Sequence, residues 1–374
     1  MKVGLDLVAI GPRSAGIGRH AVALPGALLK VEPSLELTVI VSREAPPELT
    51  AAPWARDVRW IRLPVAGGGR VGALAQYAGV PALGVARRLD LLHTPTNVGP
   101  PRVPGLPAVV TVHDLIWRHA GPEWGSPQAI AAMARLAVRA ARWATRVQAD
   151  SEATRDDVVS LARLDPAKVD VVPLGVRVDA GVPATPGSEL RARFQLGAGP
   201  VLLTVAQKRP YKNLVAAVRA VAALGDHARL VLPGAPTGHE RELRALAADL
   251  GVTGRVRFVD WIEDRDLEGL YRLASAVLVL SRYEGFGLPV LEAMARGAPV
   301  VCAESMSLPE VAGDAALLVH PDDQPAIDAA VARVVGEPGL RAELARRGRL
   351  RAARFTWERT ARETLASYRR ALAR

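Results

Sequence analysis

The feature that most constrains the fold is an alternation of short apolar strands with helical segments, which starts afresh at Pro200. In the first half, β-branched runs at residues 35–42, 58–65, 108–114 and 169–175 predict strands, and residues 21–30, 71–88, 127–144 and 152–164 predict helices. In the second half, the strand patterns "GPVLLTVA", "ARLVLPG" and "AVLVLSR" alternate with helices predicted over residues 213–224, 240–250 and 267–274. Such alternation is typical of parallel sheets covered by helices on both faces. We therefore predict an α/β chain with two doubly wound domains.

The composition between the two series indicates the domain boundary. Residues 176–199 are rich in glycine, proline and alanine and carry no clear strand pattern. We predict a first domain over residues 1–180, a linker over residues 181–198 and a second domain over residues 199–355. The last segment, 356–374, is expected to form a C-terminal helix that crosses back to the first domain.

Composition and charge argue against several classes of protein. No apolar run approaches the ~20 residues of a membrane-spanning helix, and "MKVGLDLVAIGPRS" reads as a first strand rather than a signal peptide. The single cysteine, Cys302, follows two valines, so we expect a buried structural thiol in a reducing cytoplasm. The net charge is +10, but aromatic residues are only 4% and are not interleaved with the arginines, which argues against nucleic acid as a partner. We interpret most arginines as helix-face charges and leave open a peripheral contact with an anionic membrane at its inner face.

The stretch "LVLSRYEGFGLPVLEAMARGAPVVCAE", residues 278–304, carries the strongest chemical signal. A strand pattern stops at Ser281, a turn containing Glu284 follows, and helical periodicity begins near Leu288. Ligands of open parallel sheets lie beyond the carboxyl ends of the strands, and the amides at a helix start attract anions and sugar oxygens. Glu292 lies in a helix that is apolar on most sides, so its carboxylate needs a partner, and vicinal sugar hydroxyls would suit it. The alternative is a solvated helix carboxylate and an ordinary turn residue.

These residues resemble the signature of glycosyltransferase family 4. The pattern E-G-F-G-L-P-x-x-E followed by A-M-A-x-G-x-P-V-V is similar to that of the family. The segments "GIGRH", "DLLHTPTNVGP", "VVTVHDLIW", "VVPLGV" and "TVAQKRPYKNL" resemble others of the family in the same order, so the resemblance covers essentially the whole chain. It implies a GT-B fold, in which two Rossmann-like doubly wound domains face a central cleft. It also implies a retaining hexosyltransferase that uses a nucleotide sugar, but it does not specify the substrate.

The resemblance also implies roles for particular residues. The second glutamate of the family's pair binds the donor ribose, which implies Glu292, and the first lies beside the transferred sugar, which implies Glu284. Lys212 matches the family's lysine, and a lysine at a helix start suits a diphosphate. The amides of the turn would face the sugar hydroxyls and the diphosphate; they belong to Gly285, Phe286, Gly287 and Leu288.

Two basic residues precede this lysine. Many family members have an arginine where this chain has Gln207, and Lys208 or Arg209 could supply the missing charge at the donor. The alternative for both side chains is an exposed loop charge.

The first half of the chain carries further candidates. Gly16 and Gly18 follow the first strand pattern and permit close approach of a ligand, which the resemblance places near the donor phosphate and the acceptor. His113 ends the strand of residues 108–114 and matches the family's histidine near the donor sugar, so we count it with Lys212 and Glu284 as catalytic. On the acceptor side we place three residues, each with a structural or solvent-exposed alternative: Arg19, His93 and Asp114. Asp114 could equally orient the His113 ring or cap the following segment.

No metal site and no cofactor are expected. Asp264 and Asp266 mimic the metal-binding pair of the other large glycosyltransferase fold, but they precede a helical pattern and are better explained as its N-cap. Trp261 and Ile262 either touch the nucleobase, by comparison with the family, or pack in the core.

The expected partners are a nucleotide sugar, namely GDP-mannose or a UDP or dTDP sugar, and a carbohydrate, lipid-linked or small-molecule acceptor. Two other classes of function stay open from the residues alone. One is a sugar-nucleotide epimerase of the same architecture, and the other is a non-enzymatic, basic protein that associates with membranes.

Overall fold

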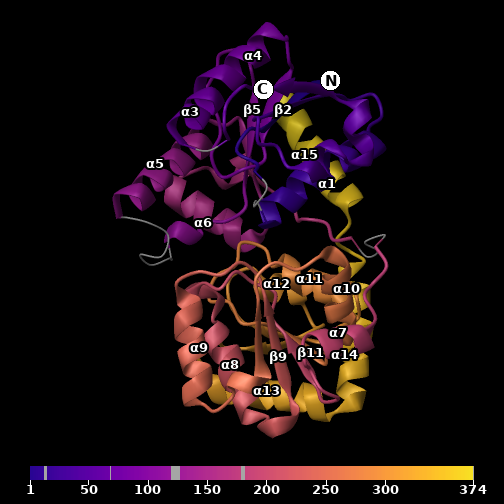
Figure 1. Ribbon diagram of the computed structural model, residues 1–374. Helices are drawn as coiled ribbons and strands as arrows, with labels where there is room; N and C mark the ends of the chain where they lie inside the picture. Colours follow the sequence, from indigo (N-terminus) through magenta and orange to yellow (C-terminus); the bar gives the residue numbers. More distant parts are fainter. Residues whose placement is uncertain (12–14, 68, 119–126, 178–181, 374) are drawn as a thin grey trace. The chain divides into compact units, whose positions relative to one another are not determined.

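The computed structural model describes residues 1–11, 15–67, 69–118, 127–177 and 182–373. They form two compact units, and each unit contains one parallel sheet (Figure 1). Unit 1 consists of Met1–Gly175 and Thr356–Arg374, and unit 2 consists of Val176–Phe355. The predicted end of the first domain, at residues 180–181, lies outside the described residues.

Unit 1 is built on a seven-stranded sheet with the order β3-β2-β1-β4-β5-β6-β7. Its strands are β1 (Lys2–Leu7), β2 (Glu36–Val41), β3 (Arg59–Arg62), β4 (Leu91–Thr94), β5 (Ala108–Val112), β6 (Arg146–Ala149) and β7 (Val169–Val171). Every residue of β4, β5 and β6 is buried, as expected for strands covered on both faces. The strand order reverses between β1 and β4, and such a reversal opens a crevice beyond the carboxyl ends of the strands.

The helices of unit 1 correspond to the predicted helical segments except for α2, which was not predicted, and for two differences in bounds. They are α1 (Ala15–Val31), α2 (Pro47–Thr50), α3 (Gly69–Leu74), α4 (Val80–Ala86), α5 (Pro127–Trp143), α6 (Glu152–Ala162) and α15 (Trp357–Leu372). Helix α1 begins earlier than predicted, and a π-helical turn at Ala75–Gly79 separates α3 from α4. Helix α15 lies alongside α1 and over strands β4 to β6 (Figure 1). Its apolar face, which includes Ala361 and Leu365, is part of the core of unit 1.

Unit 2 contains a six-stranded sheet with the order β10-β9-β8-β11-β12-β13. Its strands are β8 (Val201–Leu203), β9 (Arg229–Pro233), β10 (Val256–Val259), β11 (Ala276–Val279), β12 (Val300–Ala303) and β13 (Leu317–Val319). The order reverses between β8 and β11, so the loops that follow these two strands border the crevice of this sheet. Cys302 lies wholly buried in β12, and burial raises the pKa of its thiol, as expected for a structural residue.

Helices cover both faces of the unit 2 sheet. They are α7 (Gly187–Arg193), α8 (Leu214–Ala223), α9 (His239–Asp249), α10 (Asp264–Leu273), α11 (Leu288–Ala295), α12 (Leu308–Ala312), α13 (Gln324–Gly336) and α14 (Pro338–Ala352). Helix α7 lies within the segment predicted as a linker, but it packs against α10 and buries Leu190 completely, so it belongs to unit 2. Across the described parts of both units, no helix is long and apolar enough to cross a membrane.

The start of α10 corrects one prediction. The N-cap of this helix is Glu263, so neither Asp264 nor Asp266 caps it, and both lie in its first turn. Asp266 is buried, accepts a hydrogen bond from Thr185 Oγ1 at 2.6 Å and pairs with Arg193 at 2.5 Å. Its carboxylate therefore ties α7 and the preceding segment to α10.

Candidate functional site

The strand reversal in unit 2 brings two polar loops together. The loop after β8, residues 204–213, contains a 3-10 turn at Pro210–Lys212, and the loop after β11, residues 280–287, leads into α11. The Arg282 amide donates to the Tyr211 carbonyl at 2.8 Å, and Lys212 Nζ donates to Glu284 Oε1 at 2.5 Å. Two charged residues from separate sequence motifs thus meet at the carboxyl edge of the sheet.

The Lys212–Glu284 ion pair is partly shielded from water. The exposed fractions of the two side chains are 15% and 12%, and the Ser281 hydroxyl donates to the same Glu284 oxygen at 2.6 Å. The ammonium also lies 5.1 Å from the centre of the Tyr211 ring. Because an ammonium has three donors, Lys212 can contact a further anion at this edge while Glu284 holds its orientation.

The Ser307 side chain stabilises the turn between β11 and α11. This side chain is wholly buried, and its hydroxyl lies 2.8 Å from the Glu284 carbonyl and 2.9 Å from the Phe286 carbonyl. The Phe286 ring is buried edge-on against Phe355, with the ring centres 5.9 Å apart. The first amides of an α-helix have no carbonyl partner within the helix, so the start of α11 can bind an anion or a sugar oxygen.

Gly287 is required at this turn by its backbone conformation. Its φ of +106° is one that other residues rarely adopt, and an added Cβ would lie 2.8 Å from Leu308 Cδ2. We expect Gly287→Ala to lower the free energy of unfolding by about 1–3 kcal/mol and to weaken donor binding, because the turn must shift. Urea denaturation of the variant measures the first effect. The matched control is Gly336→Ala in α13, where an added Cβ meets nothing within 4 Å; an equal loss in both variants would contradict the prediction.

Glu292 is not a solvated carboxylate. Its exposed fraction is 7%, and its Oε2 accepts a hydrogen bond at 2.9 Å from the hydroxyl of Tyr271, a buried residue of α10. Arg296 lies over the Tyr271 ring at 5.4 Å and donates to Glu268 Oε2 at 2.6 Å. The hydrogen bond from the buried Tyr271 hydroxyl therefore orients the Glu292 carboxylate.

The structure corrects the prediction for Lys208. Its side chain is wholly buried, and its ammonium donates to the carbonyls of Gly234 and Val259, beyond β9 and at the end of β10. Burial lowers the pKa of the Lys208 ammonium, although the charge of Glu240 opposes the shift. Lys208 thus binds carbonyl oxygens within unit 2, whereas both interpretations of the sequence expected an accessible side chain. Arg209 is half-buried, and its Nε donates to Gln207 Oε1 at 3.1 Å.

In unit 1, the predicted glycines lie in a helix rather than in a loop. Gly16 and Gly18 belong to the first turn of α1, where Arg19 is exposed, and residues 12–14 of the same motif lie outside the described residues. His93 is wholly buried, with Nδ1 2.7 Å from the Tyr368 hydroxyl and Nε2 2.8 Å from Thr111 Oγ1. This corrects the acceptor-side prediction in favour of the structural alternative for His93, because the ring is not accessible.

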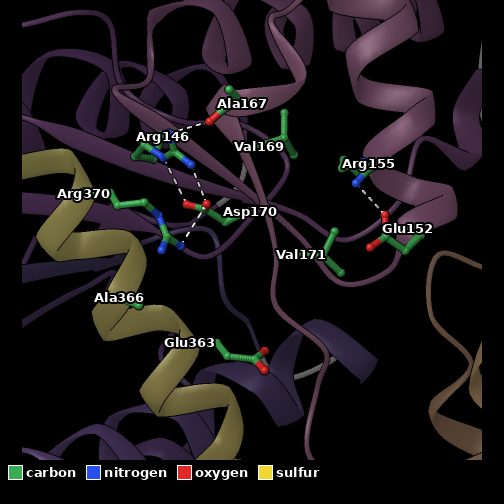
Figure 2. A pocket seen from close by; sticks show the side chains of 10 residues that line it. All are labelled: Arg146, Glu152, Arg155, Ala167, Val169, Asp170, Val171, Glu363, Ala366 and Arg370. Carbon is green, nitrogen blue, oxygen red and sulfur yellow. Dashed lines mark hydrogen bonds and ion pairs between the residues drawn. The ribbon is translucent and has the colours of Figure 1, made fainter.

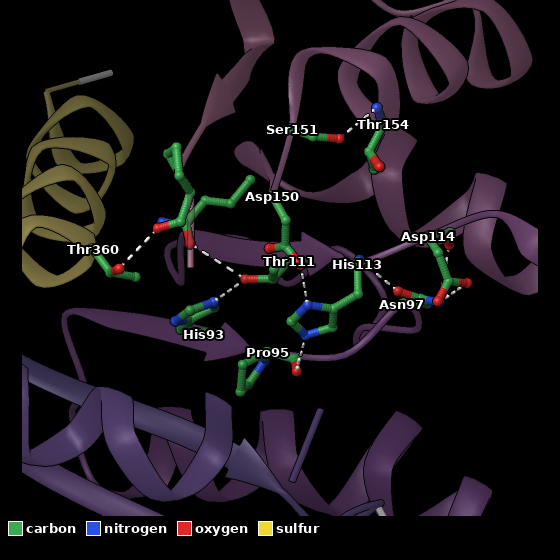
Figure 3. A network of polar contacts seen from close by, with 12 residues as sticks. His93, Pro95, Asn97, Thr111, His113, Asp114, Asp150, Ser151, Thr154 and Thr360 are labelled. Atoms are coloured by element: carbon green, nitrogen blue, oxygen red, sulfur yellow. Dashed lines mark hydrogen bonds and ion pairs between the residues drawn. The ribbon is translucent and has the colours of Figure 1, made fainter. Parts of the chain in front are cut away.

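The neighbouring side chains of His113 and Asp114 make different contacts (Figure 3). The His113 ring is buried, and its Nδ1 lies 2.6 Å from Oδ2 of Asp150, which follows β6. Asp114 does not orient this ring; its carboxylate accepts from the Ile116 amide at 3.3 Å, so it caps the following 3-10 turn. Asn97 links the two residues, since it accepts from the His113 amide at 2.8 Å and donates to the Asp114 carbonyl at 3.0 Å.

Two carboxylates of unit 1 were missed by sequence reasoning. Asp150 stands directly after a strand, which is the same signal that singled out His113. Asp6, in β1, is wholly buried and accepts hydrogen bonds from Gln76 Nε2 at 3.0 Å and Thr94 Oγ1 at 3.2 Å. Burial raises the pKa of Asp6 to about 6, and its hydrogen bonds offset only part of this shift. Asp6 is the penultimate residue of β1, before the strand ends at Leu7, so a search for residues that follow a strand does not include it.

A pocket of about 560 Å³ lies elsewhere on unit 1, beside β7 and α15 (Figure 2). Within it, Arg146 Nε donates to Asp170 Oδ2 at 3.0 Å, and Arg370 lies 2.9 Å from Asp170 Oδ1. None of the predicted site residues lines this pocket, and its charges neutralise one another.

Trp261, after β10, is 81% exposed, which excludes core packing for its side chain. Among the described residues, no group of three or more His, Cys, Asp or Glu side chains could hold a metal ion.

Family models match the two halves of the chain separately. Residues 15–180 match a model described as Glycosyltransferase Family 4, and residues 189–351 match one described as Glycosyl transferases group 1. The computed structure is similar to a crystal structure of Anabaena HepE in complex with UDP and glucose, with a TM-score of 0.76 and 19% identity over 99% of both chains.

Curated relatives carry names that agree with these models. A D-inositol 3-phosphate glycosyltransferase of Acidothermus cellulolyticus is 39% identical over 58% of this chain, and the match spans about half (51%) of that protein. An MMP alpha-(1->4)-mannosyltransferase of Mycolicibacterium hassiacum is 31% identical over 72% of this chain and 67% of that protein. With matched models on both halves and a relative aligned over two thirds of its length, the chain belongs to glycosyltransferase family 4 and has the GT-B fold.

Proposed function

We propose that this glycosyltransferase moves a hexosyl unit from a nucleoside-diphosphate sugar to a glycan, a lipid-linked glycan or a small molecule, with retention at the anomeric carbon. The observation that carries the proposal is the meeting of Lys212 and Glu284 at the reversal of the unit 2 sheet, beside the start of α11. An ammonium and helix-start amides at such an edge suit a diphosphate. The buried carboxylate of Glu292, held by Tyr271, suits a pair of ribose hydroxyls.

In the proposed reaction the acceptor oxygen attacks the anomeric carbon on the face from which the diphosphate departs. The new bond joins the acceptor oxygen to the anomeric carbon, and the bond from that carbon to the phosphate oxygen breaks with its electron pair. A phosphate oxygen of the leaving group takes the acceptor's proton, so no side chain acts as a nucleophile. Lys212 and the amides of Gly285 to Leu288 would stabilise the charge on the departing diphosphate. Glu284 would lie beside the transferred sugar, and His113 is proposed as catalytic on the family resemblance alone.

The donor is a GDP, UDP or dTDP sugar. GDP-mannose is the first to test, because the Mycolicibacterium hassiacum relative is named a mannosyltransferase. The HepE complex holds UDP and glucose, so UDP-glucose is the matched second donor. The proposed acceptors span glycans, lipid-linked glycans and small molecules because the named relatives themselves differ in what they act on.

Donor binding should be measurable before an acceptor is identified. A ligand held at 100 times its Kd should stabilise the folded chain by about 2.7 kcal/mol, which raises the midpoint of thermal unfolding. We expect this shift with one nucleoside diphosphate and its sugar, and a smaller one or none with the other bases. If no GDP, UDP or dTDP compound shifts the midpoint at millimolar concentration, the proposed donor class is wrong.

The stereochemical proposal can be tested by slow hydrolysis of the donor. With an α-configured donor, proton NMR should detect the α-anomer of the free sugar first, before it equilibrates. Appearance of the β-anomer first would contradict retention. An epimerised nucleotide sugar would instead support the epimerase, and no turnover with any donor would support a binding protein.

A further inference from the structure

The His113 ring faces hydrogen-bond acceptors on both of its nitrogens (Figure 3). Nδ1 lies 2.6 Å from Asp150 Oδ2, and Nε2 lies 3.1 Å from the Pro95 carbonyl oxygen. A carbonyl oxygen cannot donate, and an ionised carboxylate only accepts. Both contacts are hydrogen bonds only if both ring nitrogens carry hydrogen, or if the carboxyl group keeps the proton. Because an aspartic acid is ordinarily a much stronger acid than an imidazolium, the proton belongs on the ring.

Burial strengthens the pairing of these two residues. The exposed fractions are 6% for His113 and 2% for Asp150, so little water screens the attraction between their charges. Burial alone would lower the pKa of His113, but the net shift is upward, because the Asp150 charge and hydrogen bond, the Pro95 carbonyl and the Asp114 charge together outweigh it.

The other titratable neighbours of this ring are histidines that stay neutral. His20, on α1, lies edge-to-face with His113 at 5.0 Å between ring centres, and His93, on β4, is close enough to His113 for its charge to act on it. Burial lowers the pKa of His20, and the charge of His113 lowers it further. Burial and the same charge lower the pKa of His93 to about 3. Because burial disfavours charge and like charges repel one another, only one of these three buried histidines, His113, is expected to be a cation.

We propose that Asp150 is a positioning residue that keeps His113 doubly protonated and fixes its ring at the carboxyl edge of the unit 1 sheet. His113 then acts as a fixed positive charge and not as a general base, since it has no nitrogen left to accept a proton. The longer bond, to the neutral Pro95 carbonyl, is the one that a ligand oxygen can replace. The consequence for catalysis rests on the function proposed above: a fixed cation can stabilise negative charge, so donor turnover should depend on this proton.

The position of the proton can be measured without any substrate. In the full chain labelled with ¹⁵N-histidine, with the His113 signals assigned by loss in His113→Gln, we expect both ring nitrogens to be protonated at pH 7.5. In Asp150→Asn the ring should titrate about one pH unit or more lower. Asp150→Glu, which keeps the charge, should retain the doubly protonated signals. The matched control is Asp156→Asn on α6, because that carboxylate is 70% exposed and pairs with Arg155; it should leave the signals of His113 unchanged.

Kinetics provide an independent readout of the same proposal. Because the active form is protonated, donor turnover by the wild type should fall as the pH rises through the raised pKa of His113. The pH at which turnover falls should be lower in Asp150→Asn than in the wild type, and it should be unchanged in Asp156→Asn. A neutral His113 at pH 7.5 in the wild type, or unmoved signals in folded Asp150→Asn, would overturn the proposal. If no donor is turned over at all, the proposed function fails, while the nitrogen signals still decide where the proton lies.

Discussion

Replacement of Lys212 by alanine is expected to lower kcat/KM for donor turnover by about 10²-fold or more. The ammonium is held at the sheet edge by Glu284 at 2.5 Å and is only 15% exposed, so it is oriented before the donor binds. Its largest contribution should come when the diphosphate departs and its negative charge grows, so most of the loss should appear in kcat rather than in KM. Steady-state kinetics of donor hydrolysis measure both quantities.

Two controls separate this effect from a loss of structure. Lys30→Ala removes a lysine that is 71% exposed and pairs with Glu358 in unit 1, and it should retain wild-type turnover. Glu284→Gln keeps the shape of the side chain that pairs with Lys212 but removes its charge. It therefore shows whether turnover depends on the ion pair or on the Lys212 ammonium itself. Near-wild-type kcat in folded Lys212→Ala would remove this residue from the mechanism.

Replacement of Glu292 by alanine is expected to lower kcat/KM by a similar factor, about 10²-fold or more. The proposed role of its buried carboxylate is to accept two hydroxyl hydrogen bonds from the ribose. Hydrogen bonds to a charged group contribute about 1.5–3 kcal/mol each, so their loss accounts for this factor. If the donor is a GDP or UDP sugar, the wild type should discriminate against its 2′-deoxyribose analogue, and Glu292→Ala should not.

The deoxy donors make this test specific to the ribose. Tyr271→Phe, which removes the 2.9 Å hydrogen bond to Glu292, should weaken the same discrimination in part. The matched control is Glu337→Ala at the start of α14, where the carboxylate is 51% exposed and pairs with Arg333. If Glu292→Ala still discriminates against the deoxy donors as strongly as the wild type, the carboxylate does not bind the ribose.

The residues at the unit 2 edge could be predicted from the sequence because their signals are local. Each of the predicted charges follows a recognisable strand, and the carboxyl ends of parallel strands share one edge. Lys212 was assigned from the family resemblance. It meets Glu284, 72 residues away in the chain, because β8 and β11 are neighbours in the sheet, which the sequence patterns did not predict. Glu292 was singled out for a different reason, because a carboxylate surrounded by apolar helical residues must find a partner.

The partners of these residues could not be predicted, because they depend on tertiary contacts. Tyr271 reaches Glu292 from another helix, and Ser307 reaches the turn from beyond β12. Lys208 was a candidate donor contact because it could replace the family arginine that is missing at Gln207, and the alternative was an exposed loop charge. In the structure, two carbonyls at the ends of neighbouring strands, those of Gly234 and Val259, bind its ammonium instead. No local pattern distinguishes these two outcomes.

The central claim is that the donor's nucleoside diphosphate is held by the loops after β8 and β11. A crystal structure of the chain with the nucleoside diphosphate that stabilises it best tests this claim most directly. We predict phosphate oxygens in contact with Lys212 and the first amides of α11, and ribose hydroxyls within hydrogen-bond distance of Glu292. A nucleotide bound elsewhere on the chain, with Glu292 still hydrogen-bonded only within the protein, would contradict it.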